Sequence, residues 1–509
     1  MRSQVDYFSE EALRSGLKQK TVRGGLYVIL AQGTVAVIAL ASVPVMMLLL
    51  EPEDFGLVAM VTVFTGFAAM LVDAGLSIAT IQRPKITHQQ VSNLFWLATA
   101  IGFAIAAIVA ALSPLIAKFY GEPRLVPITL ALCLSFVFSG LTIQHQALLR
   151  RAMRLKAISV IQVSAYVVSY CVAITIAFLF HTYWALVTLP ITDALVRLVA
   201  TWVTSGWRPS RPRRDPEMRA LIGFGANLTG FSFVDYFARN GDNLLIGWRW
   251  GADPLGLYER AYKLMLAPLS QVTSPLYLIV VPALSRLHNE REKYRDVYFL
   301  AAILMQMVAC PLMAFVIVTA PWIVEILFGP DWSEVAPILR WLALAGFLQP
   351  LLKSHTWLYV SQSRASAMFR WGLLGSLLMN LSFIAGLPWG PIGVARAYAI
   401  VTCFLVVPVG NWYAGCQGHV TTRDLFRLTL SAVFFAIPAV LAPLLVASAM
   451  PQFSAIVKLG LSGLLSAIAL ALVVVMTKRG RTSLKMMREL LEHSLRRPGR
   501  DPQQTPQSG

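Results

Sequence analysis

Long apolar stretches alternate with short polar connections along almost the whole chain. A helix needs about 20 apolar residues to cross a bilayer, and the 509 residues contain about fourteen stretches of that length. This pattern predicts an all-α polytopic membrane protein. The predicted transmembrane helices are 24–50, 57–79, 92–117, 125–149, 157–180, 183–205, 219–248, 256–282, 297–320, 335–360, 367–388, 391–414, 428–449 and 453–476.

The basic residues fall mainly on alternate connections between these helices. Roughly three quarters of the 43 Lys and Arg residues lie at the two ends or in every second connection, and about four lie in the opposite connections. Because cytoplasmic connections retain positive charge, this asymmetry predicts that both termini are cytoplasmic. The net charge of +18 is explained by contact with anionic lipid, so nucleic acid is not expected as a partner.

The chain also repeats itself with an offset of about 200 residues. Each repeat contains six predicted helices, an even number, so both copies insert with the same orientation. We therefore predict two parallel six-helix bundles around a central cavity, followed by two C-terminal helices. The matching segments are Glu53–Leu57 with Asp253–Leu257, Pro114–Ile116 with Pro321–Ile323, and Val126–Ile128 with Ala336–Ile338.

Composition sets the predicted boundaries of the parts. The first residues carry mixed charges and lack the short apolar core of a cleavable signal, so we expect an amphipathic segment on the cytoplasmic surface. The predicted parts are the N-terminal segment 1–23, the first bundle 24–205, a basic Pro-rich linker 206–218, the second bundle 219–414, two extra helices 428–476, and a basic disordered tail 477–509.

Enzyme classes fit this chain poorly. The composition, 57% hydrophobic and 13% charged, excludes an ordinary soluble enzyme. No connection exceeds roughly 15 residues, whereas a catalytic domain needs at least about 50, which disfavours a membrane polymerase, ligase or glycosyltransferase. No GxxxxGK(S/T) motif occurs, and the five cysteines form no CxxC pair. His145 and His355 are interpreted as hydrogen-bonded structural groups, and no metal site is expected.

Two regions carry recognisable motifs. The first contains Asp73–Leu76, Gln82-Arg83 and Val91–Trp96; the second contains Asn240–Gly247 and Gly256–Tyr258 with Ala261-Tyr262. These motifs resemble the polysaccharide flippases of the MOP superfamily, and the nearest branch is the Wzx-C-like exporters of bacterial exopolysaccharides. The resemblance covers most of the chain, to about residue 415. Gly241 departs from the pattern, which has Ala at this position.

The resemblance implies a substrate and a location. A protein of this branch flips an undecaprenyl-pyrophosphate-linked oligosaccharide repeat unit from the inner to the outer leaflet of the bacterial inner membrane, by alternating access, for exopolysaccharide or lipopolysaccharide synthesis. Further partners would be the bilayer, a polysaccharide polymerase and the export machinery. No cofactor is expected, and coupling to an H⁺ or Na⁺ gradient is left open. The alternatives are a MATE-like ion-coupled drug antiporter of the same fold and, from another class, a membrane glycan polymerase or ligase.

Charged side chains inside predicted helices mark the candidate site, because a charge inside a bilayer is costly and usually functional. Arg suits a pyrophosphate through its planar fork, and Lys suits it as a point charge. All but one of the candidates lie in the second predicted bundle, so the cavity should be positively charged and lopsided, unlike the acidic cavity of a drug antiporter. Arg340, Lys353 and Arg396 could instead extend to the headgroups. The candidates are Arg197, Arg239, Arg260, Lys263, Arg340, Lys353 and Arg396.

The seventh predicted helix contains the best candidate. Asp235, Arg239 and Asp242 have i, i+4, i+7 spacing and therefore share one helix face. The acidic pair would keep Arg239 oriented until an anionic substrate competes for it; a structural ion pair between helices is the alternative. Arg260 and Lys263 share a face on the next helix and could complete a phosphate site, or Glu259 could simply neutralise Lys263.

Two further acidic positions concern the first bundle. Asp193 and Arg197 have i, i+4 spacing near the bilayer centre, where a charge pair is not expected to face lipid. Ion coupling needs a carboxylate that accepts a proton or Na⁺, and a carboxylate paired with Arg titrates too low for a proton. Asp73 has no charged partner on its own predicted helix and is the better candidate, with helix capping or gating as the alternative.

Overall fold

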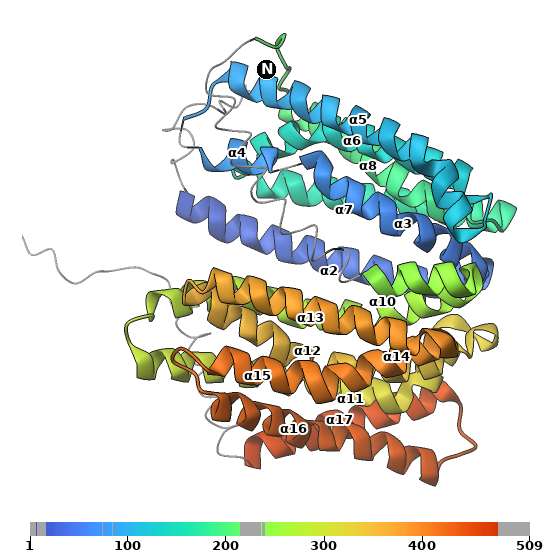
Figure 1. The fold of residues 1–509 in the computed structure, drawn as a ribbon, viewed down its shortest axis with the longest axis vertical. Coiled ribbons are helices and arrows are strands. Elements are labelled where there is room, and N and C mark those ends of the chain that lie inside the picture. Colours follow the sequence, from blue (N-terminus) through green and yellow to red (C-terminus); the bar gives the residue numbers. More distant parts are fainter. Residues whose placement is uncertain are drawn as a thin grey trace, which may run out of the picture. The chain divides into compact units, whose positions relative to one another are not determined.

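The computed structural model describes residues 7, 17–73, 75–83, 85–213, 236 and 240–476, without the side chains of residues 17–23 and Gln82. These residues are helical apart from short connections, and none of them is assigned to a strand (Figure 1). The all-α membrane fold expected from the apolar pattern is therefore confirmed. The predicted N-terminal segment, apart from Tyr7 and residues 17–23, and the predicted tail lie outside the described residues.

Twelve helical stretches among the described residues are long and apolar enough to cross a membrane. Two predicted helices are not counted separately. The predicted helix 219–248 falls mostly outside the described residues, which are helical there from 240 to 250. The predicted helices 367–388 and 391–414 fall within one run, Ala365–Gly415. The total of about fourteen remains a prediction.

The run Ala365–Gly415 is long enough for two crossings. At 1.5 Å per residue its 51 residues would extend about 76 Å, more than twice the apolar thickness of a bilayer. It consists of α13 (Ala365–Gly386), the short turn η2 (Leu387–Trp389), α14 (Gly390–Val401), the π-helical turn η3 (Thr402–Val406) and α15 (Val407–Gly415). The ring of Phe383 in α13 lies 5.6 Å from that of Tyr398 in α14, so the chain folds back at η2.

By packing, the chain divides into two compact units. Unit 1 comprises Met1–Leu264, Ile323–Leu342 and Arg370–Val401; unit 2 comprises Met265–Trp322, Ala343–Phe369 and Thr402–Gly509. Helices α10 (Ala252–Arg286), α11 (Arg291–Phe328), α12 (Val335–Ser361) and α13 run from one unit into the other. The boundaries of the two sequence-predicted bundles remain a prediction.

Unit 1 contains seven helices from the first part of the chain (Figure 1). A capping box stabilises the N-terminus of α5. The Thr87 hydroxyl accepts a hydrogen bond from the backbone N–H of Gln90, and the side-chain oxygen of Gln90 accepts one from the backbone N–H of Thr87. Gly102 of α5 and Gly140 of α6 allow these two helices to pack with their backbones in contact. The seven helices are α2 (Leu17–Leu49), α3 (Pro52–Asp73), α4 (Leu76–Gln82), α5 (His88–Tyr120), α6 (Leu125–Arg151), α7 (Leu155–Phe180) and α8 (Trp184–Ser205).

Unit 2 ends in the helix pair α16 (Thr422–Ala449) and α17 (Ala455–Met476), which lie side by side (Figure 1). Polar bonds attach α16 to its neighbours. Arg295 contacts Asp424 at 2.9 Å, and Ser431 donates to Gln306 at 3.0 Å. Asn411 donates to Thr429 at 3.0 Å, and its carbonyl oxygen meets the ring of His355 at 3.0 Å. Helix α16 is thus fixed to unit 2 at three levels.

The first pair of repeated segments meets inside unit 1. A Cβ atom on Gly56 of α3 would overlap the carbonyl oxygen of Ala252, and one on Gly256 of α10 would overlap that of Pro52. Each glycine therefore faces the residue four positions before the other glycine. Such an exchange of equivalent contacts is what a two-fold axis between two copies produces. The sequence repeat thus corresponds to a reciprocal crossing of α3 and α10.

Candidate functional site

One candidate cluster lies at the start of α10. The carboxylate of Glu259 is buried and forms ion pairs with both Arg260 and Lys263. The distance from Arg260 Nε to the carboxylate oxygen is 2.6 Å. The Arg260 guanidinium also lies over the ring of Phe55 in α3, 4.3 Å from its centroid. Neutralisation by Glu259, one of the two alternatives for Lys263, is therefore observed and extends to Arg260. Two cations share one anion, so the cluster retains one net positive charge.

Of the three charged residues predicted to share one helix face (Asp235, Arg239 and Asp242, the predicted charge ladder), Asp242 is the one that the structure describes. Its side chain is 3% exposed, and it accepts hydrogen bonds from the Tyr258 hydroxyl at 3.0 Å and the Asn243 amide at 2.8 Å. Asp235 and Arg239 lie outside the described residues, so the ladder remains a prediction. Because Tyr258 precedes Glu259, Asp242 is connected to the cluster at the start of α10.

Asp193 and Arg197 form the ion pair that their spacing predicted. Arg197 donates from Nε to one carboxylate oxygen at 2.6 Å and from Nη2 to the other at 3.0 Å. The two side chains are 28% and 29% exposed. The pair is therefore bidentate, and part of it is accessible from outside the protein.

The remaining cations occupy different places. Arg396 of α14 lies 5.3 Å from the ring centroid of Trp341, which follows Arg340 in α12, and both arginines are exposed. The structure thus places Arg396 against Trp341, the residue that follows Arg340 in the chain, within unit 1. Lys353 is exposed and belongs to unit 2.

Asp73, the last residue of α3, is hydrogen-bonded to Ser77 in the first turn of the short helix α4. One carboxylate oxygen accepts from the Ser77 amide at 2.9 Å and the other from the Ser77 hydroxyl at 2.6 Å. The N-cap residue of α4 is Gly75, so the choice between helix capping, gating and ion coupling for Asp73 stays a prediction.

Sequence reasoning missed the aromatic partners of these charges. Phe55 lies in the repeated segment Glu53–Leu57 and Tyr258 in the second motif region, but the sequence analysis connected neither of them with a charge. Gly241, the departure from the motif, has a physical reason: a Cβ there would overlap the side-chain oxygen of Asn380 in α13. Alanine at this position would therefore require the Asn380 side chain to move.

The motif in α5 holds the beginning of the linker. The side chain of Asn93 forms hydrogen bonds with both backbone groups of Arg213. It donates to the carbonyl oxygen at 2.7 Å and accepts from the backbone N–H at 3.0 Å. Trp96 donates to the Ser210 carbonyl at 2.8 Å, and the Ser210 amide donates to Ser92 at 3.0 Å. These α5 residues share one helix face. The described part of the linker, residues 206–213, is therefore bound through its backbone and through the buried side chain of Trp207, while its arginine side chains stay exposed.

Outside the apolar segments, an ion cluster joins two connections. Arg124 contacts Glu122 at 2.8 Å and also pairs with Glu53, at the start of α3. The hydrogen bond from Arg124 lowers the pKa of Glu122 below its usual range, and the two carboxylates raise the pKa of Arg124. Such exposed pairs contribute little to stability.

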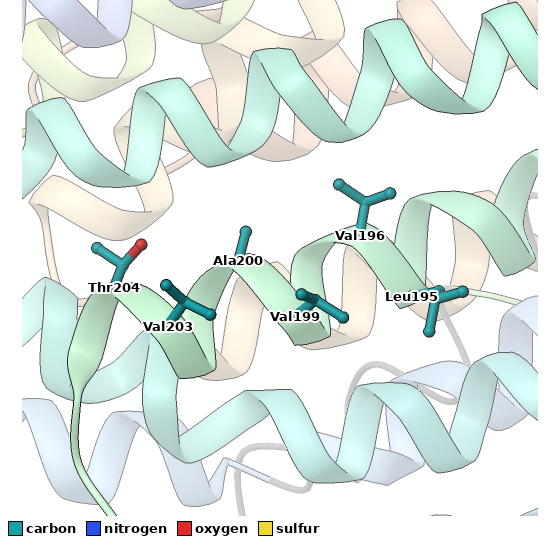
Figure 2. A pocket seen from close by; sticks show the side chains of 6 residues that line it. All are labelled: Leu195, Val196, Val199, Ala200, Val203 and Thr204. Atoms are coloured by element: carbon teal, nitrogen blue, oxygen red, sulfur yellow. The ribbon is translucent and has the colours of Figure 1, made fainter.

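Neither the pockets nor the metal-binding residue types add a chemical centre. A hollow of about 530 Å³ lies along α8, and Figure 2 shows its six lining side chains in succession on that helix. None of the six is charged, so the hollow suits hydrocarbon. In the part of the chain that the structure describes, no three His, Cys, Asp or Glu side chains lie together in a way that could hold a metal ion. The six side chains that line the hollow along α8 are those of Leu195, Val196, Val199, Ala200, Val203 and Thr204.

Known proteins match both the sequence and the fold. Residues 45–337 match the family model described as polysaccharide biosynthesis protein. The teichuronic acid biosynthesis protein TuaB of Bacillus subtilis (strain 168) is 26% identical, over 76% of this chain and 78% of its own. The lipopolysaccharide biosynthesis protein WzxC of Escherichia coli (strain K12) is 24% identical, over 76% and 79%. The succinoglycan biosynthesis transport protein ExoT of Rhizobium meliloti (strain 1021) is 24% identical, over 65% and 67%.

Two solved structures define the fold. The lipid II flippase MurJ, in an inward closed conformation, superposes with a TM-score of 0.67 at 13% identity, covering 87% of this chain and 97% of its own. An inward-facing multidrug transporter of the MATE family superposes with a TM-score of 0.54 at 14% identity, covering 79% and 95%. The chain therefore shares its fold with both proteins, and the MATE transporter belongs to the MOP superfamily that the sequence motifs indicated.

Proposed function

Since this chain belongs to the polysaccharide biosynthesis protein family, we propose that it is a flippase for a lipid-linked oligosaccharide in the bacterial inner membrane. The substrate is an undecaprenyl-pyrophosphate-linked repeat unit, and it moves from the inner to the outer leaflet. Both termini are cytoplasmic, because the basic connections then lie inside. The protein is a transporter and performs no covalent chemistry.

The observation that carries this proposal is the net positive charge at the start of α10. A pyrophosphate cannot enter hydrocarbon without fixed cations, and a charge-assisted bond from Arg or Lys is about twice as strong as a neutral one. Arg260 and Lys263 share the single carboxylate of Glu259, so one of them can exchange it for phosphate. Arg239, 13 residues before the first residue of α10 in the sequence, is the second proposed phosphate ligand.

The crossing of α3 and α10 supports alternating access. The repeated glycines hold the two helix starts in backbone contact, and Arg260 lies on Phe55 beside them. For substrate to leave on that side, these contacts must separate. Exchange of Glu259 and Phe55 for phosphate would release Arg260 from α3 and couple binding to opening.

A drug antiporter is the second candidate, because the MATE neighbour has the same fold. The charge of the described clusters argues against it. A cationic drug needs an acidic site, whereas the cluster at the start of α10 has one positive charge in excess and Arg340 and Arg396 lie exposed. The proposal includes no cofactor, and the energy source is an ion gradient of H⁺ or Na⁺.

Complementation tests the proposal. A flippase-null strain that expresses the wild-type chain should export polysaccharide, and its inner leaflet should not accumulate lipid-linked repeat units. Arg239→Ala and Arg260→Gln should each lower export at least about tenfold at unchanged protein level, because each removes a charge-assisted phosphate contact. Arg286→Gln, at the exposed far end of α10, is the matched control and should export normally.

Failure of the wild-type chain to export in a strain whose own flippase restores export would contradict the proposal. Normal export from Arg239→Ala or Arg260→Gln would remove that residue from the phosphate site.

A further inference from the structure

Two tyrosines of α7 lie together halfway along the helix. Tyr166 and Tyr170 are one turn apart, with hydroxyls 3.4 Å and ring centroids 4.8 Å from each other. Both side chains are half-buried. The sequence analysis singled out neither of them, because tyrosine in an apolar helix is ordinary core or interface material.

The ion pair of α8 completes this group. Asp193 lies close enough to Tyr166 to act on it electrostatically, and it holds Arg197 by two hydrogen bonds. We refer to Tyr166, Tyr170, Asp193 and Arg197 as the α7–α8 polar cluster. All four belong to unit 1, so the cluster is defined within one compact unit.

The depth of the cluster indicates a polar environment. Tyr166 is about 16 Å along α7 from its first residue, and Asp193 about 14 Å along α8, which is near the middle of a bilayer. A charge pair at this depth avoids lipid. Helix α8 has a separate apolar surface for lipid, since Leu195, Val199 and Val203 are 43%, 55% and 68% exposed. The partly exposed cluster is therefore expected to face a polar environment rather than lipid.

Charge decides which part of the substrate the cluster suits. The bidentate bond leaves the pair without net charge, so it offers no excess cation to a pyrophosphate. It does offer carboxylate acceptors, guanidinium donors and two phenolic hydroxyls on adjoining helices. Aromatic faces beside such groups can pack against the apolar faces of sugar rings. This combination fits uncharged polyols with adjacent hydroxyls.

We propose that the α7–α8 polar cluster is a sugar-binding subsite for the neutral glycan of the lipid-linked substrate. The inference rests on the proposed function and divides the substrate between two sites. The start of α10 holds the pyrophosphate, and the α7–α8 polar cluster holds the sugar. Tyr166 and Tyr170 contribute hydroxyl donors and a stacking surface, and Asp193 and Arg197 bond sugar hydroxyls.

The test removes the hydroxyls without removing the rings. The double variant Tyr166→Phe/Tyr170→Phe is expressed in the flippase-null strain, and surface polysaccharide is measured per amount of membrane-embedded protein. In parallel, the purified variant in lipid nanodiscs is titrated with undecaprenyl pyrophosphate, a probe that has no sugar. Thr175→Val removes one hydroxyl from an exposed position of the same helix and is the matched control.

The expected result is an export loss of about tenfold for the double variant, because two hydrogen bonds to substrate are lost. Its affinity for undecaprenyl pyrophosphate should equal that of the wild type, and Thr175→Val should match the wild type in both assays. Arg197→Lys keeps the charge but loses the planar fork, and it should show the same split between export and probe binding. If the double tyrosine variant does not reach the membrane, Arg197→Lys tests the sugar-binding subsite in its place.

Wild-type export from both variants would overturn the subsite, and so would an equal loss of probe binding, which indicates a phosphate or structural role. These results leave export by the wild-type chain intact. A wild-type chain that does not export refutes the proposed function itself, together with this inference.

Discussion

At the residue scale, Glu259 determines how much positive charge the start of α10 presents. It is 7% exposed and pairs with Arg260 and Lys263 at once. Spacing along one helix predicted its contact with Lys263, and likewise that of Asp193 with Arg197. Phe55, which contacts Arg260, lies on another helix, and Tyr258, which donates to Asp242, is 16 residues from it in the sequence. Only the tertiary structure therefore identifies these two partners.

Removal of this shared carboxylate should destabilise the protein. Glu259→Gln leaves two cations close together without their anion, and breaking a buried pair in this way costs about 3 kcal/mol. The unfolding free energy of the purified protein, from titration with SDS in mixed micelles, measures the effect. Glu290→Gln removes the carboxylate of an exposed pair with Lys293 and should cause no measurable change. Equal effects of the two variants would refute a special role for Glu259.

At the element scale, the length of apolar segments predicted most helices, because bilayer thickness fixes how long they must be. The binding of the linker backbone by α5, in contrast, has no recognisable pattern in the sequence. Asn93 and Trp96 hold Arg213 and Ser210 through main-chain groups, which every residue has. The sequence identified the α5 motif and the linker separately, but nothing in it indicated that one binds the other.

The crossing of α3 and α10 yields a prediction about glycine. Gly56→Ala and Gly256→Ala each place a methyl group against a backbone carbonyl oxygen, and such overpacking costs about 1–3 kcal/mol. Each should lower the thermal midpoint and the export rate. Because both act on one crossing, the double variant should lose less than the sum of the two effects.

Gly33→Ala is the matched control for these variants. Gly33 lies in α2, and nothing lies within 4 Å of a Cβ atom added there. It should therefore behave like the wild type. If Gly56→Ala also behaves like the wild type, the crossing is not a constraint on the fold or on transport.

At the scale of the whole molecule, the repeat predicted two related copies, and Gly56 and Gly256 meet as such copies should. The membrane fold followed from composition and apolar length, and the family followed from two motif regions. The assignment of each charge to sugar, phosphate or a structural partner did not follow, because it depends on pairings between helices that are distant in the sequence. The structure supplies one such pairing, that of Arg260 in α10 with Phe55 in α3, whereas Arg197 and Lys263 pair within their own helices.

The most direct test of the central claim is transport by the purified chain in proteoliposomes. Vesicles that contain an undecaprenyl-pyrophosphate-linked oligosaccharide in both leaflets, with an H⁺ or Na⁺ gradient across the membrane, are treated with a membrane-impermeant glycan-oxidising reagent, and the protected fraction is followed with time. The account predicts that the wild-type chain brings almost all of the substrate to the outer surface, while Arg260→Gln vesicles retain a protected pool. A protected fraction as large with the wild-type chain as in protein-free vesicles would contradict it.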